Sequence, residues 1–477
     1  MTGPNVRLTD GRVLQIEDRP IASGGEKTVF FTRDRRSVVG FYHGRLSDRL
    51  ERVDRLTRIV AKYDPTCGTR GDYWASYFCW PTGIADGASS GVPEAFARRH
   101  SLVWPVLGVV TPTYRPQFFF TDRFGTKQEK EVKWFIGRKA SAFVPDAEKG
   151  SLATRLQICT RLARAVRRLH FAGLAHSDLS NKNVLIDPKA GDACVIDIDS
   201  LVVPGVAPPS VLGTPGYIAP EVLAGRAKPS IATDNHALAV LIYQILLQRH
   251  PLQGKKVHST VSAEEDERLS MGERACFIEH PTDWTNPPLQ PIRVPFTRLG
   301  PHLEQVILKS FVHGLHHPGK RADAAEWEVA LYRTLNMLYP THSGRQWAVV
   351  GPGLPLDEPF SGERISGAIP VARYLRDTGD RLVDERQTLT VFHHLTLHSW
   401  HTLVGTSPDE HADRRPLGYF AQDGGKWWLV NLSGIPFEVM PGTVVAHQSS
   451  VELRPGLTIR LGDDRRARVL AFDFLRA

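Results

Sequence analysis

The chain has 477 residues and a formal net charge of +8, with 42% hydrophobic and 23% charged residues. One hydrophobic core normally organises fewer residues, so this length predicts two or three domains. No uninterrupted apolar run approaches the roughly 20 residues that cross a bilayer, which favours a soluble chain that does not enter membranes. The positive excess is spread along the chain, so nucleic acid binding is not favoured.

The cysteines give no sign of a metal site or a disulfide framework. All five are scattered, without a CxxC pair, and no apolar signal core follows the first residues. We therefore expect free thiols and a cytoplasmic location.

Strand-like and helix-like segments follow each other along the first two thirds of the chain. Residues 1–112 alternate short β-branched and aromatic runs with turns and contain one charged helical stretch near 47–62, which predicts a small sheet with one helix. Two prolines within 111–116 predict a stiff connector and a hinge. Apolar residues at three- and four-residue steps predict a helix over 151–173, and the apolar stretch 233–247 predicts a buried one.

The last third of the chain reads differently. Residues 343–387 are predicted to be a linker, because the segment from Ser343 to Gly367 is rich in Gly and Pro and lacks periodicity. Residues 388–477 contain short strand-like runs between turn signals, including one over His398–Val404, and predict a β-sandwich. The expected class is α+β, with a charged insertion at 252–300 in the helical part that spans 113–342.

The densest polar signal lies after the first long helix. The segment His176–Asp187 holds Asp178 and Asn183 five residues apart, and Asp197 follows a short apolar strand. Phosphoryl transfer needs a carboxylate that orients the acceptor hydroxyl. It also needs oxygen ligands for a divalent metal, which an amide and a second carboxylate can supply. The pattern therefore predicts a phosphoryl-transfer site.

These motifs resemble those of eukaryotic-type (Hanks-like) protein kinases. His176–Asn183 is similar to the HRDLxxxxN catalytic loop and Asp197–Asp199 to the DFG motif. The resemblance extends to Gly213–Glu221, which is similar to the substrate-facing loop that ends in APE. In Thr233–Leu238, Asp234 is similar to the aspartate that anchors the catalytic loop. Arg321 is similar to the arginine that pairs with the APE glutamate, here Glu221. The wording is most similar to bacterial kinases of tellurium-resistance and related stress loci.

That resemblance implies a bilobal kinase fold over about residues 1–342, ATP and Mg²⁺ as cofactors, and a protein substrate. It implies metal binding by Asn183 and Asp197. Gene-neighbour partners such as a von Willebrand A protein and a PP2C-type phosphatase are implied by the same resemblance.

The amino-terminal part departs from the kinase pattern. The strand Ser37–Tyr42 lacks the usual lysine that holds the nucleotide phosphates, and Gly40 or Phe41 stands in its place. Lys27, directly after the glycine turn of Gly24 and Gly25, resembles the displaced lysine of WNK kinases, and a small residue at Gly40 would leave room for it. Glycines at such a turn let backbone N–H groups approach phosphates.

We expect Lys27 to take an acidic partner from the first helix. Glu51 is preferred there over Asp54.

Three more positions bear on regulation and specificity. Ser177 replaces the arginine that reads a phosphorylated loop, so switching of the usual kind is not implied. Asp199 replaces the DFG glycine and either stiffens the turn or offers a further metal carboxylate. Thr214 matches the threonine of Ser/Thr-directed kinases, whereas Lys182 is similar to a basic position of some tyrosine-directed ones, and Thr214 is the better guide because it is expected beside Asp178.

The tail resembles the final strands of forkhead-associated (FHA) sandwiches. Trp427–Gly434 and Val451–Gly462 carry this resemblance, but the phosphate-binding Arg, Ser and His of such domains are mostly missing. Arg414 or Arg415 stands near the expected place of an anion contact. A structural or protein-docking module is the preferred interpretation of this degenerate FHA-like domain.

The preferred function is an ATP-dependent Ser/Thr protein kinase with a relocated lysine. Two alternatives stay open: a pseudokinase scaffold, and a small-molecule phosphotransferase of the aminoglycoside or choline kinase type. The Gly213–Glu221 loop and the Asp234 helix argue against the second.

Overall fold

The computed structural model describes residues 2–43, 48–209 and 213–476, and the chain divides into two compact units. Unit 1 consists of Met1–Gly150, Ile158–Pro291 and Ile307–Glu328, and unit 2 of Ser151–Gln157, Ile292–Val306 and Val329–Ala477. Among the described helices, none combines the length and the hydropathy that are needed to cross a membrane. The predicted α+β class is confirmed, since helices and sheets make up unit 1 and a region of strands follows it.

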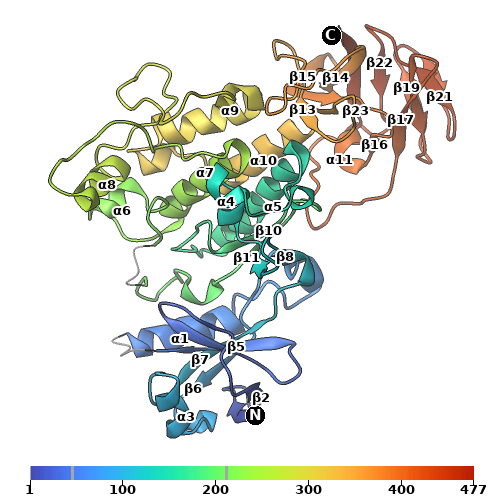
Figure 1. Cartoon of the computed structure of the whole chain (residues 1–477). Coiled ribbons are helices and arrows are strands. Elements are labelled where there is room, and N and C mark those ends of the chain that lie inside the picture. Colours follow the sequence, from blue (N-terminus) through green and yellow to red (C-terminus); the bar gives the residue numbers. More distant parts are fainter. Residues whose placement is uncertain (1, 44–47, 210–212, 477) are drawn as a thin grey trace. The chain divides into compact units, whose positions relative to one another are not determined.

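Unit 1 begins with an antiparallel sheet that has the strand order β3-β4-β5-β7-β6 (Figure 1, blue). The helix α1 (Arg49–Ala61) buries Leu56 in a cluster with Tyr42 and Val109 of this sheet. The strands of the sheet, and of the hairpin that precedes it, are β1 (Thr2–Arg7), β2 (Val13–Glu17), β3 (Ala22–Ser23), β4 (Lys27–Phe31), β5 (Ser37–Tyr42), β6 (Gly83–Asp86) and β7 (Leu107–Pro112).

The connector after β7 leads into the helical part of unit 1. Tyr114 lies in this connector and packs against a buried cluster that includes Leu185 and Ile196. Short elements before the first long helix are α2 (Gly71–Trp74), α3 (Glu94–Arg99), β8 (Phe119–Thr121), β9 (Lys127–Glu129) and α4 (Arg138–Ser141).

Two long helices frame the polar motifs. The helix α5 (Leu152–Phe171) precedes them, and α7 (Ile231–Leu247) is buried along almost its whole length because its residues are apolar on all sides. Ser230 caps α7, since its side chain and that of Thr233 form a capping box. The other elements of this part are β10 (Val184–Asp187), β11 (Asp192–Val195), α6 (Pro220–Leu223) and α8 (Ala263–Met271), and the helices α9 (Pro301–Leu308) and α10 (Ala324–Leu335) each contain residues of both units.

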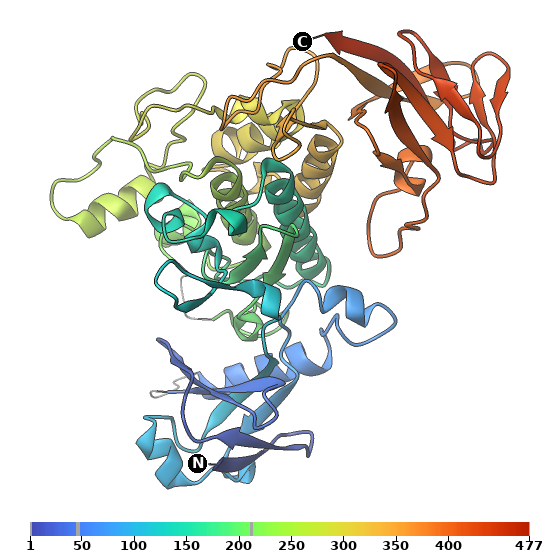
Figure 2. The same cartoon turned by 45° about the vertical axis from the view of Figure 1, so that its right-hand side comes forward.

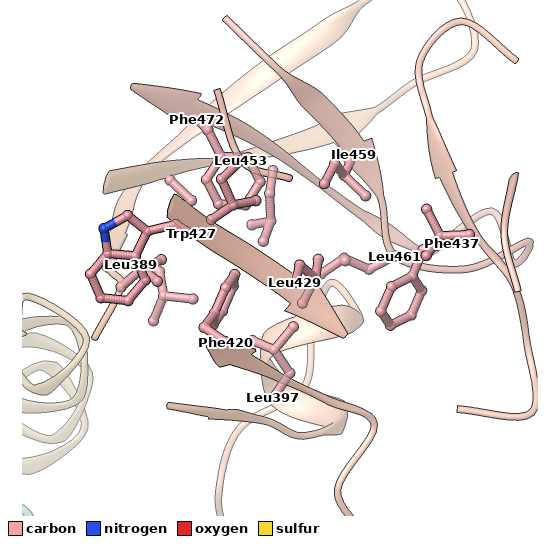
Figure 3. Packing of buried hydrophobic residues seen from close by; sticks show 14 of the residues in the cluster. Leu389, Leu397, Phe420, Trp427, Leu429, Phe437, Leu453, Ile459, Leu461 and Phe472 are labelled. Carbon is pink, nitrogen blue, oxygen red and sulfur yellow. The ribbon is translucent and has the colours of Figure 1, made fainter. Parts of the chain in front are cut away.

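The described part of unit 2 contains two larger antiparallel sheets with the strand orders β15-β14-β23-β22-β19-β20 and β16-β17-β18-β21 (Figure 2, orange and red), and a two-stranded sheet of β12 and β13. Phe420 and Leu429 of the second sheet share one buried core with Ile459 and Phe472 of the first, and Figure 3 shows these side chains between the strands. The strands are β12 (Leu338–Pro340), β13 (Trp347–Val349), β14 (Ala368–Asp377), β15 (Leu382–Thr390), β16 (Thr396–Leu397), β17 (Gly418–Asp423), β18 (Lys426–Asn431), β19 (Phe437–Val439), β20 (Thr443–Val445), β21 (Ser450–Glu452), β22 (Thr458–Arg460) and β23 (Arg468–Arg476).

Two expectations for the tail are corrected by this arrangement. The predicted linker 343–387 is too long, because β14 and most of β15 lie within it and belong to the larger sheet. The strand expected over His398–Val404 is instead a short helix, α11 (Ser399–Thr402), in which the ring of His401 accepts a hydrogen bond from the backbone N–H of His398 at 3.0 Å.

Candidate active site

The polar segment after α5 is anchored by Asp234, which lies in the first turn of α7. The carboxylate of Asp234 accepts hydrogen bonds from the backbone N–H groups of His176 at 2.6 Å and Ser177 at 3.2 Å. The Nε2 atom of His176 lies 2.9 Å from the backbone oxygen of Ile196, at the end of β11. A buried carboxylate and a buried imidazole therefore fix the loop against the helix and the next strand.

Asp178 is half-buried and its carboxylate is held from two sides. The Nδ2 atom of Asn183 donates to Oδ2 of Asp178 at 3.0 Å and to its backbone oxygen at 2.8 Å. The backbone N–H and the hydroxyl of Thr214 donate to Oδ1 at 2.6 and 2.7 Å. The structure thus places Thr214 beside Asp178, and the carboxylate has one fixed orientation toward the loop that contains Thr214.

Asp197 follows β11 in a left-handed conformation with φ of +56°. Its side chain is 51% exposed, and one of its oxygens lies 3.2 Å from the ammonium of Lys27. Asn183 uses its amide nitrogen on Asp178, so its amide oxygen is the atom suited to an ion. Carboxylate and amide oxygens are ligands that Mg²⁺ prefers, and two protein ligands with substrate phosphates are a common set, so the residues fit this ion.

Within the described residues, no group of three or more His, Cys, Asp or Glu side chains is arranged to hold a metal. A Mg²⁺ site that used Asn183 and Asp197 would be of another kind, in which phosphate and water would supply the remaining oxygens.

Lys27 is the first residue of β4, and its ammonium lies among acidic groups. Its Nζ atom donates to both carboxylate oxygens of Asp199 at 2.9 Å and to Asp197 at 3.2 Å. Burial alone lowers the pKa of Lys27, but the charges of Asp199 and Asp197 outweigh burial and raise its pKa well above the usual value. Lys27 is therefore a charged ammonium in a low-dielectric site.

Gly40 makes room for the stem of Lys27. The two residues lie on neighbouring strands, and a Cβ atom added at Gly40 would stand 3.5 Å from Cδ of Lys27. A longer side chain at position 40 would occupy the space that the lysine crosses.

The expected partner of Lys27 requires a correction. Glu51 lies exposed on α1, and Asp54 pairs with Arg58 on the same helix at 3.0 Å. The carboxylate that meets the ammonium is Asp199, which is buried. The buried positions of α1 are taken by Arg52, Arg55, Leu56 and Ile59, and Glu51 is left in solvent.

The glycine turn lies between β3 and β4. The backbone N–H of Gly24 donates to the backbone oxygen of Lys27 at 2.9 Å, and both glycines are exposed. A Cβ atom at Gly25 would meet nothing within 4 Å, so the space above this turn is open.

The segment after Thr214 ends in a buried ion pair. The guanidinium of Arg321 donates to the two carboxylate oxygens of Glu221 at 2.7 and 2.6 Å, and the arginine side chain is 0% exposed. Glu221 lies in the first turn of α6, so this pair fixes the carboxyl end of the loop that holds Thr214.

Two residues of this site have no counterpart in the sequence-based predictions. The hydroxyl of Tyr42 donates to Asp199, and the guanidinium of Arg52 lies 4.7 Å from the centre of the Tyr42 ring. Burial and the charge of Asp199 raise the pKa of Tyr42, so the phenol keeps its proton. A signal was present, because Arg52 and Arg55 stand three residues apart in the predicted helical stretch and therefore lie near each other on its surface.

Comparison with known proteins identifies the class of this site. Residues 145–315 match the model of the protein kinase domain. The chain is 31% identical over 136 residues to the serine/threonine-protein kinase PknD of Chlamydia abortus. The aligned residues make up 24% of this chain and 14% of that protein. It is 37% identical over 95 residues to the dual serine/threonine and tyrosine protein kinase of Xenopus tropicalis. The aligned residues make up 20% of this chain and 10% of that protein.

The matched stretch holds Asp178, Asn183, Asp197 and Thr214. Residues 145–315 are therefore similar to a protein kinase domain, and the matched stretches span only about a tenth to a seventh of the length of these relatives.

Proposed function

We propose that this chain is an ATP-dependent protein kinase that transfers the γ-phosphoryl group to a serine or threonine hydroxyl of a protein, within a bilobal kinase fold. The orientation of Asp178 carries the proposal, since one oxygen is held by Asn183 and the other by Thr214. Phosphoryl transfer depends on positioning of the acceptor and on charge neutralisation more than on covalent chemistry.

Asp178 acts on the acceptor hydroxyl. Its carboxylate accepts the hydroxyl proton as the oxygen of the substrate forms its bond to phosphorus, and the bond from the γ-phosphorus to the bridging oxygen of ADP breaks. Thr214 keeps one carboxylate oxygen in place from the substrate-facing loop. The same contact supports Ser/Thr specificity, whereas Lys182 is exposed.

Lys27, Gly24 and Gly25 hold the triphosphate in this proposal. The ammonium of Lys27 provides the positive charge that the strand Ser37–Tyr42 lacks, and the open turn allows backbone N–H groups to approach phosphate oxygens. Mg²⁺ bound by Asn183 and Asp197 would neutralise phosphate charge when present.

Ser177 gives no receptor for a phosphorylated loop, since its hydroxyl donates to the backbone oxygen of Ser200 at 2.9 Å. Control by a partner is favoured over control by loop phosphorylation, and a von Willebrand A protein and a PP2C-type phosphatase are the partners that the resemblance suggests. In the tail, Arg415 is paired with Asp413 at 2.6 Å, which supports protein docking over phosphopeptide recognition for the FHA-like module.

Replacing Asp178 with alanine tests this function. We expect transfer of labelled phosphate from ATP to peptides that carry Ser or Thr to fall about 10²- to 10⁴-fold. Binding of ADP, measured by calorimetry, should change less than about twofold, because Asp178 faces Asn183 and Thr214 rather than Lys27. Phosphoamino-acid analysis of the wild-type product reports whether Ser, Thr or Tyr is the acceptor.

The matched control is Asp146→Asn, which removes a charge whose side chain is 86% exposed. Wild-type transfer by Asp178→Ala would remove the proposed role. Nucleotide binding without any transfer by the wild-type chain would favour the scaffold, and transfer to aminoglycosides or choline but not to peptides would favour the small-molecule phosphotransferase.

A further inference from the structure

The helix α1 presents positive charge where a partner for Lys27 was expected. Arg52 and Arg55 are both buried, and Arg52 faces Tyr42 of the sheet, whereas Arg55 donates to the backbone oxygen of Ala207 at 2.8 Å. The guanidinium of Arg52 stacks over the ring of Tyr42 and lies 3.2 Å from the carboxylate of Glu26. The ammonium of Lys27 lies 5.7 Å from the centre of the same ring. A lysine held by this helix would meet like charge, so its counterion must come from another element.

Asp199 supplies that counterion from a segment far away in sequence. It lies in a short turn, Ile198–Ser200, and only 5% of it is exposed. Both carboxylate oxygens accept from Lys27 at 2.9 Å, and one of them also accepts from the hydroxyl of Tyr42. Both carboxylate oxygens of Asp199 therefore accept hydrogen bonds from side chains of β4 and β5.

This geometry separates Asp199 from its neighbour Asp197. Asp197 is half-exposed and shares one oxygen with Lys27, whereas the buried Asp199 uses both of its oxygens on Lys27 and Tyr42. A metal ligand needs an oxygen that faces the ion. Asp199 lacks that arrangement, and a residue that merely stiffened the turn would not need three hydrogen bonds from the side chains of Lys27 and Tyr42.

We propose that Asp199 is the positioning residue for Lys27, in place of a carboxylate from α1. This proposal rests on the proposed function. The hydroxyl of Tyr42 donates to Asp199, and the guanidinium of Arg52 packs against the ring of Tyr42. The phosphate-binding ammonium and the metal-binding Asp197 are consequently set by one short segment, residues 197–200, which α1 contacts directly.

Asp199→Asn tests this role by separating nucleotide affinity from metal affinity. We expect KM for ATP and the Kd of Mg²⁺-free ADP to rise about tenfold, while the Mg²⁺ concentration for half-maximal rate at saturating ATP changes less than twofold. Asp197→Asn should instead raise the Mg²⁺ requirement. Asp199→Glu should recover part of the affinity, because a carboxylate near Lys27 is restored.

A double variant and a labelling measurement complete the test. Lys27→Met with Asp199→Asn should bind Mg²⁺-free ADP no more weakly than Lys27→Met alone, because Asp199 acts through the lysine. Acetylation of Lys27, followed by mass spectrometry without nucleotide, should be faster in Asp199→Asn and unchanged in the control Asp187→Asn, which removes a different buried partner, that of Lys130.

An equal rise in the Mg²⁺ requirement for Asp199→Asn and Asp197→Asn would overturn the proposal. Unchanged acetylation of Lys27 in Asp199→Asn would also overturn it, as would losses of ADP affinity that multiply in the double variant. The labelling and ADP measurements need no turnover. If the wild-type chain transfers no phosphate and these results hold, the proposed function fails while the role of Asp199 stands.

Discussion

Replacing Lys27 with methionine is expected to lower kcat/KM for ATP by about 10²- to 10³-fold, because a fixed charge aimed at the phosphates is removed. The substitution keeps the stem that lies beside Gly40 but leaves the buried Asp199 without its counterion, so the thermal stability of the variant is measured with its kinetics. Steady-state kinetics with varied ATP, and calorimetry with ADP, provide the measurement. Lys127→Met is the matched control, since Lys127 is exposed and lies over the ring of Phe119.

A double variant tests whether the ammonium of Lys27 does the work of the lysine that is missing from β5. Position 40 pairs with Val29 on the strand that begins with Lys27, and its Cβ direction meets the lysine stem. The exchange Lys27→Gly with Gly40→Lys returns the ammonium to the strand where protein kinases usually carry it. We expect this double variant to be more active than Lys27→Met. Turnover that survives Lys27→Met at the wild-type level would show that another group holds the phosphates.

The catalytic loop could be predicted from sequence because its residues act over short distances in the chain. Asp178 and Asn183 are five residues apart and lie in one turn, so their spacing nearly determines that they meet. Thr214 was expected beside Asp178 by resemblance, and the structure places it there.

The partner of Lys27 could not be found in this way. Asp199 lies 172 residues further along the chain, and nothing in the local sequence links it to β4. Two arginines, Arg52 and Arg55, occupy buried positions of α1, so this helix presents positive charge there. The sequence showed a charged helical stretch near 47–62, but which of its charges are buried depends on the elements that pack against the helix.

The boundary of the tail was misplaced for a related reason. β15 is the first strand of its sheet order and carries Asp384, Glu385 and Arg386, so only its end is buried and its alternation is weak. Such an edge strand resembles a polar linker in sequence. β14 is buried over most of its length, but Pro370 within it reads as a turn signal.

Replacing Glu221 with glutamine is expected to lower the free energy of unfolding by about 3–5 kcal/mol, because a buried guanidinium loses its counterion. All five N–H groups of Arg321 are used, two on Glu221 and the others on the backbone oxygens of Gly314, Leu315 and Ala232. The arginine cannot turn to solvent without breaking these bonds. Denaturant unfolding of the full chain, followed by tryptophan fluorescence, measures the change.

Two comparisons decide whether the charge is responsible. Glu94→Gln removes the partner of Arg98, whose side chain is 79% exposed, and should cost less than about 1 kcal/mol. The double substitution Glu221→Met and Arg321→Met removes both charges and should recover part of the loss, since no unpaired charge stays buried. A loss below about 1 kcal/mol in Glu221→Gln would contradict the prediction. Because Glu221 fixes the end of the loop that brings Thr214 to Asp178, turnover should fall together with stability in Glu221→Gln, whereas Glu94→Gln should leave turnover unchanged.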